Sequence, residues 1–220
     1  MGDRASKDAL YDGFAMVAKA LANGRRAEIV DVLSQGERSV EDLAAEIGQS
    51  VANTSQHLRY LAGAGLVRTR RDGNRVIYAL TGPRVGQLWT TLRSVAADHV
   101  AQIDRLAAAY LGDREGLETI SRDELARRLR TGEVVILDVR PAAEYRAGHI
   151  LGARPVPIAT LPDELDRLPH GQEVVAYCRG PYCVYADDAV RELRRRGVPA
   201  RRLEDGYPEW AEAGLPTAAG

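Results

Sequence analysis

Hydrophobic positions recur with a helical period in the first third of the chain. Four segments before residue 65 carry apolar side chains three or four positions apart, which predicts four helices. Turn and capping signals separate them: the first helix stops at Asn23-Gly24, the second stops at Gln35-Gly36, the third follows the Ser39-x-x-Asp42 capping pattern, and the fourth follows Ser50. The third and fourth segments therefore predict two helices joined by a tight turn.

The pattern becomes strand-like behind Gly65. Residues 66–70 and 75–80 are β-prone and flank Arg71-Asp72-Gly73-Asn74, a hairpin turn sequence. From about Arg84 to Leu111 the helical period returns and predicts one helix roughly 40 Å long. Such a helix is too long for one small domain to cover, so we expect it to pack against a second copy of the chain. The alternative is that other helices of the same domain cover it.

The second half alternates strand and helix patterns. After a polar connector, Ser121-x-x-Glu124 caps one helix, and another helical stripe runs from about Tyr185 to Arg196. Residues 134–137 and 174–177 are nearly all apolar, which is typical of strands buried on both faces of a parallel sheet. The predicted fold class is two domains: a mainly-α winged helix-turn-helix at 1–112, a linker at 113–118, and an α/β domain with a mainly parallel sheet at 119–220.

Composition supports a globular protein and excludes several other classes. Of 220 residues, 45% are hydrophobic and 28% are charged. No apolar stretch reaches the ~18–20 residues that a membrane-spanning helix needs, and the N-terminus lacks the apolar core of a secretion signal. Cys178 and Cys183 are the two cysteines, too few for a disulfide-stapled secreted scaffold. We therefore expect a cytoplasmic protein.

Local charge indicates a nucleic-acid surface, although the net charge of −1 does not. A capped helix, a tight turn, a second helix and an arginine-bearing hairpin predict a winged helix-turn-helix whose second helix enters the major groove. We expect Val51, Leu58 and Leu61 to face inward. The expected DNA-binding residues, on the outward face and the hairpin, are Ser50, Asn53, Thr54, Gln56, His57, Arg59, Arg68, Arg70, Arg71 and Arg75. The alternative is a solvated polar helix face beside a soluble hairpin.

Cys178 stands where a strand ends and a helix is about to begin. A loop at such a place can direct several backbone N–H groups at one point, where the helix dipole also favours negative charge. A Cys178 thiolate or persulfide would be stabilised there, with Gly180 allowing a sharp bend and Arg179 adding positive charge. The alternative is a structural cysteine that behaves as a small hydrophobe, which two cysteines around an Arg-Gly-Pro turn fit poorly.

The first half resembles the ArsR family of bacterial repressors, through the segment Gly48–Val67 and the hairpin Arg70–Tyr78. The resemblance implies a homodimer that binds a pseudo-palindromic operator in double-stranded DNA and represses transcription until an inducer releases it. Metal-sensing members carry a Cys-Val-Cys motif where this chain has Ser39-Val40-Glu41, and Asp98-His99 has no second histidine at a useful spacing. We therefore expect no metal site, and any sulfur-based signal must enter through the second half.

The second half resembles rhodanese, the sulfurtransferase fold, through Leu137–Ile150, Val175–Gly180 and Leu203–Trp210 in the family's order. The resemblance implies that the Cys178 thiolate attacks a sulfane sulfur donor, forms a persulfide and passes the outer sulfur to a thiol acceptor. No cofactor is implied. The expected catalytic residues are Cys178, Arg179, Gly180 and Cys183.

The cysteine loop departs from the family pattern at its sixth position. Where the family often has arginine, this chain has Cys183, which should weaken selection for an anionic donor such as thiosulfate. Cys183 is instead a potential resolving thiol that could convert the persulfide into a disulfide or a bridged polysulfide. Phosphatase and arsenate-reductase relatives need an arginine where Val184 stands, so we expect neither activity.

Together the two halves predict a sulfur-responsive DNA-binding transcriptional regulator, acting as a repressor, with no membrane partner. The connector and the long helix are the candidate routes of coupling between the halves. The alternative is a sulfurtransferase whose DNA-binding half serves only targeting or dimerisation, and a third hypothesis is an inert interaction module, against which the presence of Cys178 argues.

Overall fold

The computed structural model describes residues 2–168 and 171–220. The chain divides into two compact units, of which the first ends at Leu92 and the second begins at Arg93. Among the described helices, none combines the length and the apolar character that a membrane-spanning segment requires.

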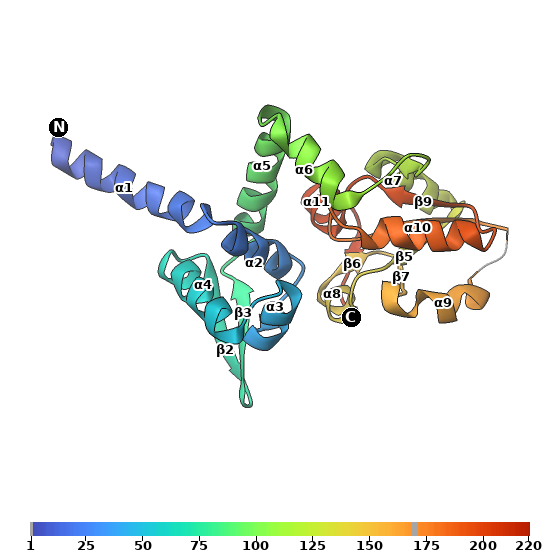
Figure 1. Cartoon of the computed structure of the whole chain (residues 1–220), viewed down its shortest axis with the longest axis horizontal. Helices are drawn as coiled ribbons and strands as arrows, with labels where there is room; N and C mark the ends of the chain where they lie inside the picture. The colour runs from blue at the N-terminus through green and yellow to red at the C-terminus, as the bar shows by residue number, and fades with distance from the viewer. Residues whose placement is uncertain (1, 169–170) are drawn as a thin grey trace. The chain divides into compact units, whose positions relative to one another are not determined.

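The first unit is a helix-turn-helix with a hairpin. Its elements are α1 (Arg4–Leu21), α2 (Gly24–Ser34), β1 (Arg38–Ser39), α3 (Val40–Glu46), α4 (Val51–Gly63), β2 (Val67–Asp72) and β3 (Arg75–Leu80). The predicted caps are confirmed, because Ser39 Oγ accepts from the Asp42 amide at 3.1 Å and Ser50 Oγ accepts from the Asn53 amide at 3.2 Å. The strands form an antiparallel sheet in the order β1-β3-β2, of which Figure 1 labels β2 and β3. The two-residue strand β1 carried no signal in the sequence.

The expectation of one helix from Arg84 to Leu111 is wrong. The segment forms two helices, α5 (Pro83–His99) and α6 (Gln102–Leu111), and α5 crosses the division between the two units. At the break the Ile103 amide donates to the Val100 carbonyl at 2.8 Å, a tighter turn than the α-helical ladder makes. Val100 and Ala101 preserve the apolar spacing and include neither Pro nor Gly, so the periodicity could not reveal the interruption.

The second unit is built on a five-stranded sheet in the order β4-β9-β8-β5-β7, and every pairing in it is parallel. The strands are β4 (Thr119–Ile120), β5 (Val134–Asp138), β7 (Arg154–Pro155), β8 (Glu173–Tyr177) and β9 (Ala200–Leu203), while β6 (His149–Ile150) and β10 (Thr217–Ala218) form a separate antiparallel pair. The helices are α7 (Arg122–Thr131), α8 (Ala142–Ala147), α9 (Leu161–Glu164), α10 (Tyr185–Arg195) and α11 (Tyr207–Glu212), with 3-10 turns at Ile158–Thr160 and Leu165–Arg167.

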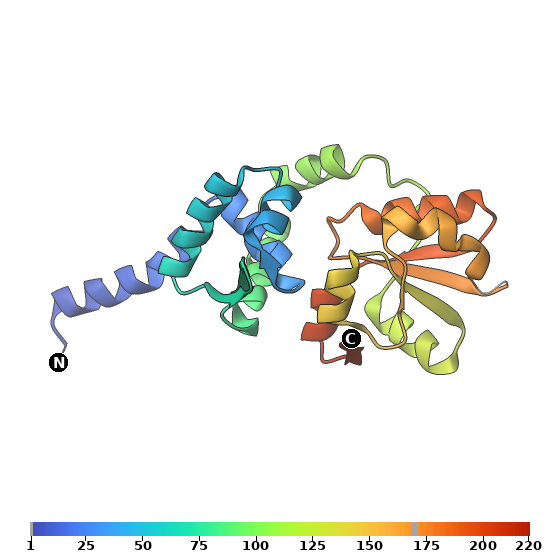
Figure 2. The ribbon, with the colours of Figure 1, turned by 90° about the horizontal axis from the view of Figure 1, so that it is seen from below.

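Helices cover both faces of this sheet, so four of the five residues in each of its central strands β5 and β8 are buried. Along β8, Val174 and Ala176 pack in one apolar cluster with residues of α9 and α10. The alternate residues Val175 and Tyr177 pack in a second cluster with residues of α7 and α11. Figure 2 shows α9 and α10 on one side of the sheet and α7 on the other. This sandwich explains the continuous apolar run in the sequence and places the residue after Tyr177 at the carboxyl edge of the sheet.

Candidate functional site

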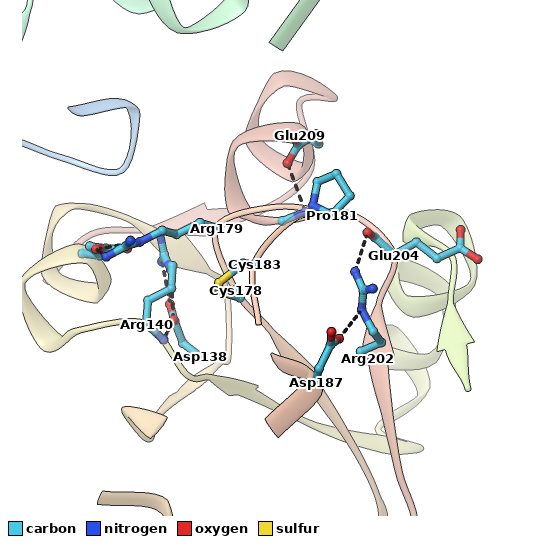
Figure 3. Close-up of a disulfide and its surroundings, with 12 residues drawn as sticks. Asp138, Arg140, Cys178, Arg179, Pro181, Cys183, Asp187, Arg202, Glu204 and Glu209 are labelled. Atoms are coloured by element: carbon cyan, nitrogen blue, oxygen red, sulfur yellow. Dashed lines mark hydrogen bonds and ion pairs between the residues drawn. A yellow bond between two sulfur atoms is a disulfide. The ribbon is translucent and has the colours of Figure 1, made fainter. Parts of the chain in front are cut away.

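The two cysteines lie in one loop at the carboxyl end of the central strand β8. Cys178 directly follows β8, and α10 begins at Tyr185, two residues after Cys183. The cysteines are joined by a disulfide, with their Cα atoms 6.3 Å apart (Figure 3). The Cys183 amide also donates to the Gly180 carbonyl at 3.2 Å, which closes a tight turn inside the loop. The loop therefore brings together two thiols that can exist bonded or apart.

Cys178 is buried in this state. Its side chain is 1% exposed and belongs to the apolar cluster on the α9 and α10 side of the sheet, whereas Cys183 is partly exposed. Among the described residues, no hydrogen bond to either sulfur accompanies the disulfide. A bonded sulfur cannot ionise, so Cys178 becomes a nucleophile only after the disulfide is reduced. Stabilisation of a thiolate by converging amides stays a prediction for the reduced loop.

The positive charge of Arg179 is paired with a carboxylate and is not free to act on the sulfur atoms. Its guanidinium donates to both oxygens of Glu144, from Nε at 3.1 Å and from Nη2 at 2.6 Å. Glu144 is fully buried on α8, and the Arg179 side chain is only 13% exposed. A buried carboxylate needs such a partner. The positive charge expected beside the cysteine is thus neutralised by Glu144, and Arg179 anchors the loop to α8.

A buried polar cluster holds the strand ends beneath the loop. Arg140 and Asp138 form a fully buried ion pair, and the Tyr177 hydroxyl donates to Asp138 Oδ2 at 2.5 Å. The same hydroxyl accepts from the Ile150 amide at 3.1 Å. Burial, reinforced by the neighbouring Asp138 charge, raises the pKa of Tyr177. Tyr177 therefore stays a protonated donor and fixes β8 immediately before Cys178.

The connector contributes a contact to the loop that the sequence did not reveal. Arg114 donates from Nη1 to the Pro181 carbonyl at 2.9 Å, and its Nη2 lies 3.5 Å from the Cys183 carbonyl oxygen. Its Nε donates to Asp187 at 2.6 Å, and Asp187 is fully buried in the first turn of α10. Asp187 also lies 3.4 Å from Nε of Arg202 (Figure 3). An arginine in a polar connector gives no signal of its partners, because these follow about seventy residues later.

Most of the predicted DNA-binding residues of α4 lie on its exposed face, with one exception. Asn53, Gln56 and Arg59 are exposed, and His57 is half-buried. Ser50 is also exposed, but its side chain caps the helix by accepting a hydrogen bond from the Asn53 amide. The expectation for Thr54 is wrong, because Thr54 is fully buried and its hydroxyl donates to the Ser50 carbonyl at 3.0 Å.

The expectation that Val51 faces the core is also wrong. Val51 is 44% exposed, because it occupies the first turn of α4, where the helix has begun but its apolar stripe has not yet reached the core. Leu58 and Leu61 are fully buried as predicted. The exposed face of α4 therefore lacks Thr54 and includes Val51.

The hairpin presents its arginines unequally. Arg70 pairs with Glu37 and with Asp72, and its hydrogen bond to Glu37 lowers the pKa of that carboxyl. Arg68, Arg71 and Arg75 are exposed and form no ion pair within the part of the chain that the structure describes. The turn between the strands is Gly73-Asn74, with Gly73 at φ 58°, a left-handed conformation that favours glycine. Three cations on the hairpin, Arg71 and Arg75 near its tip and Arg68 near its open end, are thus available to an anionic partner.

Asp98 and His99 lie at the end of α5. Within residues 2–168 and 171–220, no three His, Cys, Asp or Glu side chains group in a way that could hold a metal ion.

Comparison with known proteins gives a family for each half. Residues 23–69 match the family described as bacterial regulatory protein, arsR family, and residues 121–213 match the rhodanese-like domain. The chain is 48% identical over 219 residues to the HTH-type transcriptional regulator Rv0324 of Mycobacterium tuberculosis, covering 100% of this chain and 96% of that protein. Over 90 residues it is 40% identical to the cadmium resistance transcriptional regulatory protein CadC homolog of Staphylococcus aureus, covering 39% of this chain and 74% of that protein.

Several solved structures are also similar to the first half, among them a DNA-binding domain. It is the homodimeric winged helix-turn-helix DNA-binding domain of Mb0332 from Mycobacterium bovis, with 43% identity and a TM-score of 0.43, covering 46% of this chain and 93% of that one.

Proposed function

The chain belongs to the ArsR family of HTH-type transcriptional regulators and carries a C-terminal rhodanese-like domain, and from this premise we propose that it is a sulfur-responsive repressor. Its signal is the chemical state of Cys178 and Cys183. The observation that carries the proposal is the disulfide between these residues in a loop at the edge of the sheet. A loop that accommodates this bond has both thiols within reach of one another, as a persulfide and its resolving thiol require.

The chemistry starts from the dithiol. The Cys178 thiolate attacks a sulfane sulfur of a polysulfide, forming the Cys178 persulfide and releasing the polysulfide shortened by one sulfur atom. Cys183 loses its proton to water and attacks Sγ of Cys178, forming the disulfide and expelling hydrosulfide with the electron pair of the broken bond. The two thiols are oxidised by two electrons, and one sulfane sulfur is reduced to sulfide. Two molecules of a thiol reductant restore the dithiol.

We place DNA contacts on α4 and on the hairpin of the first unit. The amides of Asn53 and Gln56 have the donors and acceptors that read base edges, and His57 and Arg59 flank them. The free cations on the hairpin, Arg68, Arg71 and Arg75, suit phosphates or a minor groove. Thr54 takes no part, since its side chain is buried. We assign the DNA-binding domain to residues 1–112, the linker to 113–118 and the sulfur-reading domain to 119–220, and expect the protein to act in the cytoplasm.

A homodimer on a pseudo-palindromic operator completes the proposal. In α1 the apolar side chains of Leu10, Tyr11, Phe14 and Met16 are between 52% and 64% exposed. In α5 and α6, Leu88, Leu92, Val95, Leu106 and Tyr110 are likewise exposed. Apolar side chains gathered along helices at this level of exposure are typical of a surface that a partner covers.

The test uses the reduced full-length protein, its two single-cysteine variants and sodium tetrasulfide. Intact-mass spectrometry should show disulfide formation in the wild type, one added sulfur atom in Cys183→Ser and no adduct in Cys178→Ser. Binding to a duplex selected from a randomised pool by the reduced wild type should weaken at least fivefold in the wild type, the lower end of typical allosteric couplings. Cys178→Ser should show no change. Equal affinities of the treated and untreated wild type would refute the switch.

A sulfurtransferase enzyme is the second candidate, favoured by the rhodanese-like match over residues 121–213. Turnover of thiosulfate or tetrasulfide with a thiol acceptor at enzyme-like rates, together with DNA binding that ignores sulfur, would support it. Rapid closure of the disulfide opposes turnover, because Cys183 then competes with the external acceptor for the persulfide. The Cys183→Ser variant should therefore turn over faster than the wild type under the regulator hypothesis.

A further inference from the structure

Arg114 stands between the cysteine loop and the chain segment that leads to the first unit. It lies two residues after Gly112, the C-cap of α6, and Leu117 donates to its carbonyl within the connector. Its guanidinium contacts the carbonyl oxygens of Pro181 and Cys183 and pairs with Asp187. One planar side chain therefore holds the far half of the loop and the first turn of α10 together.

The loop carbonyls that Arg114 holds are the ones that the disulfide constrains. Cys183 is itself one of the bonded residues, and Pro181 lies inside the ring that the bond closes. Two bonded sulfurs lie much closer together than two non-bonded sulfurs can, so reduction separates the Cys178 and Cys183 sulfur atoms. If the loop backbone follows the sulfur atoms, the Pro181 and Cys183 carbonyls shift, and the guanidinium geometry that fits the disulfide form no longer fits the dithiol form equally well.

Release of Arg114 does not leave the Asp187 carboxylate without a cationic neighbour. Asp187 is fully buried, and losing every cationic partner would leave an uncompensated charge. A second arginine, Arg202, already lies 3.4 Å from its other carboxylate oxygen and is itself 6% exposed. Burial lowers the pKa of Arg202, and the Arg114 charge lowers it further. When Arg114 leaves, Arg202 remains to balance Asp187 and is relieved of a repelling neighbour.

The rest of the connector is held from α10 and not from the loop. Arg191 donates to the Asp113 carbonyl at 2.6 Å, and Arg194 donates to the Gly116 carbonyl at 2.5 Å. Neither contact involves a residue of the cysteine loop. They also supply a matched control, because Arg191 anchors the residue next to Arg114 and pairs with Asp188 on its own helix.

We propose that Arg114 is the positioning residue that links the dithiol or disulfide state of the Cys178–Cys183 loop to the connector. The inference rests on the proposed function, because it assumes that the loop changes between these states in the protein's working cycle. Linkage is reciprocal: if the disulfide favours docking of Arg114, docked Arg114 favours the disulfide by the same factor. Arg114 thus acts on the regulatory reaction without touching the reacting sulfur atoms.

The experiment measures both directions of this linkage in the full-length protein. Wild type, Arg114→Gln and Arg191→Gln are equilibrated in glutathione buffers, and the disulfide fraction is counted by alkylation and mass spectrometry. Arg114→Gln should shift the equilibrium toward the dithiol at least fivefold, and Arg191→Gln less than twofold. Hydrogen exchange of the peptide covering 111–118 should rise on reduction of the wild type and be equally fast in both states of Arg114→Gln.

A conservative variant protects the test against misfolding. Arg114→Lys keeps the charge beside Asp187 but cannot hold two carbonyls and a carboxylate at once, so its shift should lie between those of wild type and Arg114→Gln. Equal redox equilibria for wild type and both Arg114 variants, or an equal shift in Arg191→Gln, would overturn the inference. Equal DNA affinities of the two wild-type states would refute the regulator proposal alone, because the redox and exchange measurements do not depend on DNA.

Discussion

Single residues in this protein act mainly through what they pair with. The Asp138–Arg140 pair is fully buried, and Arg140 also donates to the Gly148 carbonyl at 2.7 Å, so one guanidinium links β5, α8 and the Tyr177 hydroxyl network. Both residues lie within the segment Leu137–Ile150 that resembles rhodanese. Both side chains are fully buried and paired with each other, so we assign them a structural role.

Replacing Arg140 should be costly because it strands a buried charge. We expect Arg140→Met to reduce the free energy of unfolding of the second unit by about 3–5 kcal/mol. Urea unfolding, followed through buried Trp210 in a Trp89→Phe background, measures this. The double variant with Asp138→Leu should cost less than the sum of the two single changes. Arg167→Gln, at an exposed pair with Glu164, should change stability by less than about 0.5 kcal/mol; a comparable loss there would contradict the burial argument.

Two elements approach closely where the cysteine loop meets α11. Gly206 is the N-cap of α11, and a Cβ there would overlap the backbone of Arg179 and Gly180. Its φ of −126° is open to any residue, so the requirement for glycine is the close approach and not the torsion. The Tyr207 amide next to it donates to the Cys178 carbonyl at 3.1 Å. The closing segment of the chain thereby shapes the loop from outside.

An added methyl group at Gly206 should displace the loop. We expect Gly206→Ala to change the rate at which iodoacetamide alkylates Cys178 in the reduced protein several-fold, since thiolate population depends on the local environment. Gly132→Ala is the matched control, because it introduces left-handed strain at φ 69° in the same unit with nothing within 4 Å. Gly132→Ala should lower stability and leave alkylation unchanged. If both variants alkylate like wild type, the Gly206 contact does not shape the loop.

A single chain leaves the apolar side chains of α1 exposed. Of the eighteen residues of α1, the buried ones are Ala20 and Leu21, and Figure 1 shows the earlier turns of this helix extending beyond the other helices of the first unit. An isolated helical extension gains little from propensity alone, so we expect α1 to pack against a second copy of the chain.

Charges on the apolar face of α1 should break that assembly. The double change Leu10→Glu with Phe14→Glu should convert the protein from dimer to monomer in sedimentation velocity and weaken binding to the selected duplex at least tenfold. Leu151→Glu is the control, because Leu151 is similarly exposed, at 56%, but lies in the second unit. A double variant that still sediments as a dimer would show that α1 does not form the interface.

Much of the fold was predictable because it depends on interactions between residues that are close together in the sequence. The serine caps of α3, α4 and α7 hydrogen bond to amides three positions ahead, so sequence spacing alone announces them. The apolar runs of β5 and β8 follow from burial on both faces, and the cysteine loop is located by the strand before it and the helix after it. The break between α5 and α6 was missed because it preserves the periodicity.

The local pattern by itself determined the two domains, their order, the helix-turn-helix and the position of the two thiols. Tertiary structure alone decided that Thr54 is buried, that Glu37 takes Arg70, that Glu144 neutralises Arg179, and that Arg114 reaches the cysteine loop. The reason is physical: hydrogen bonds within one turn depend on sequence spacing, whereas ion pairing and desolvation depend on distances between segments that only the packed chain brings together.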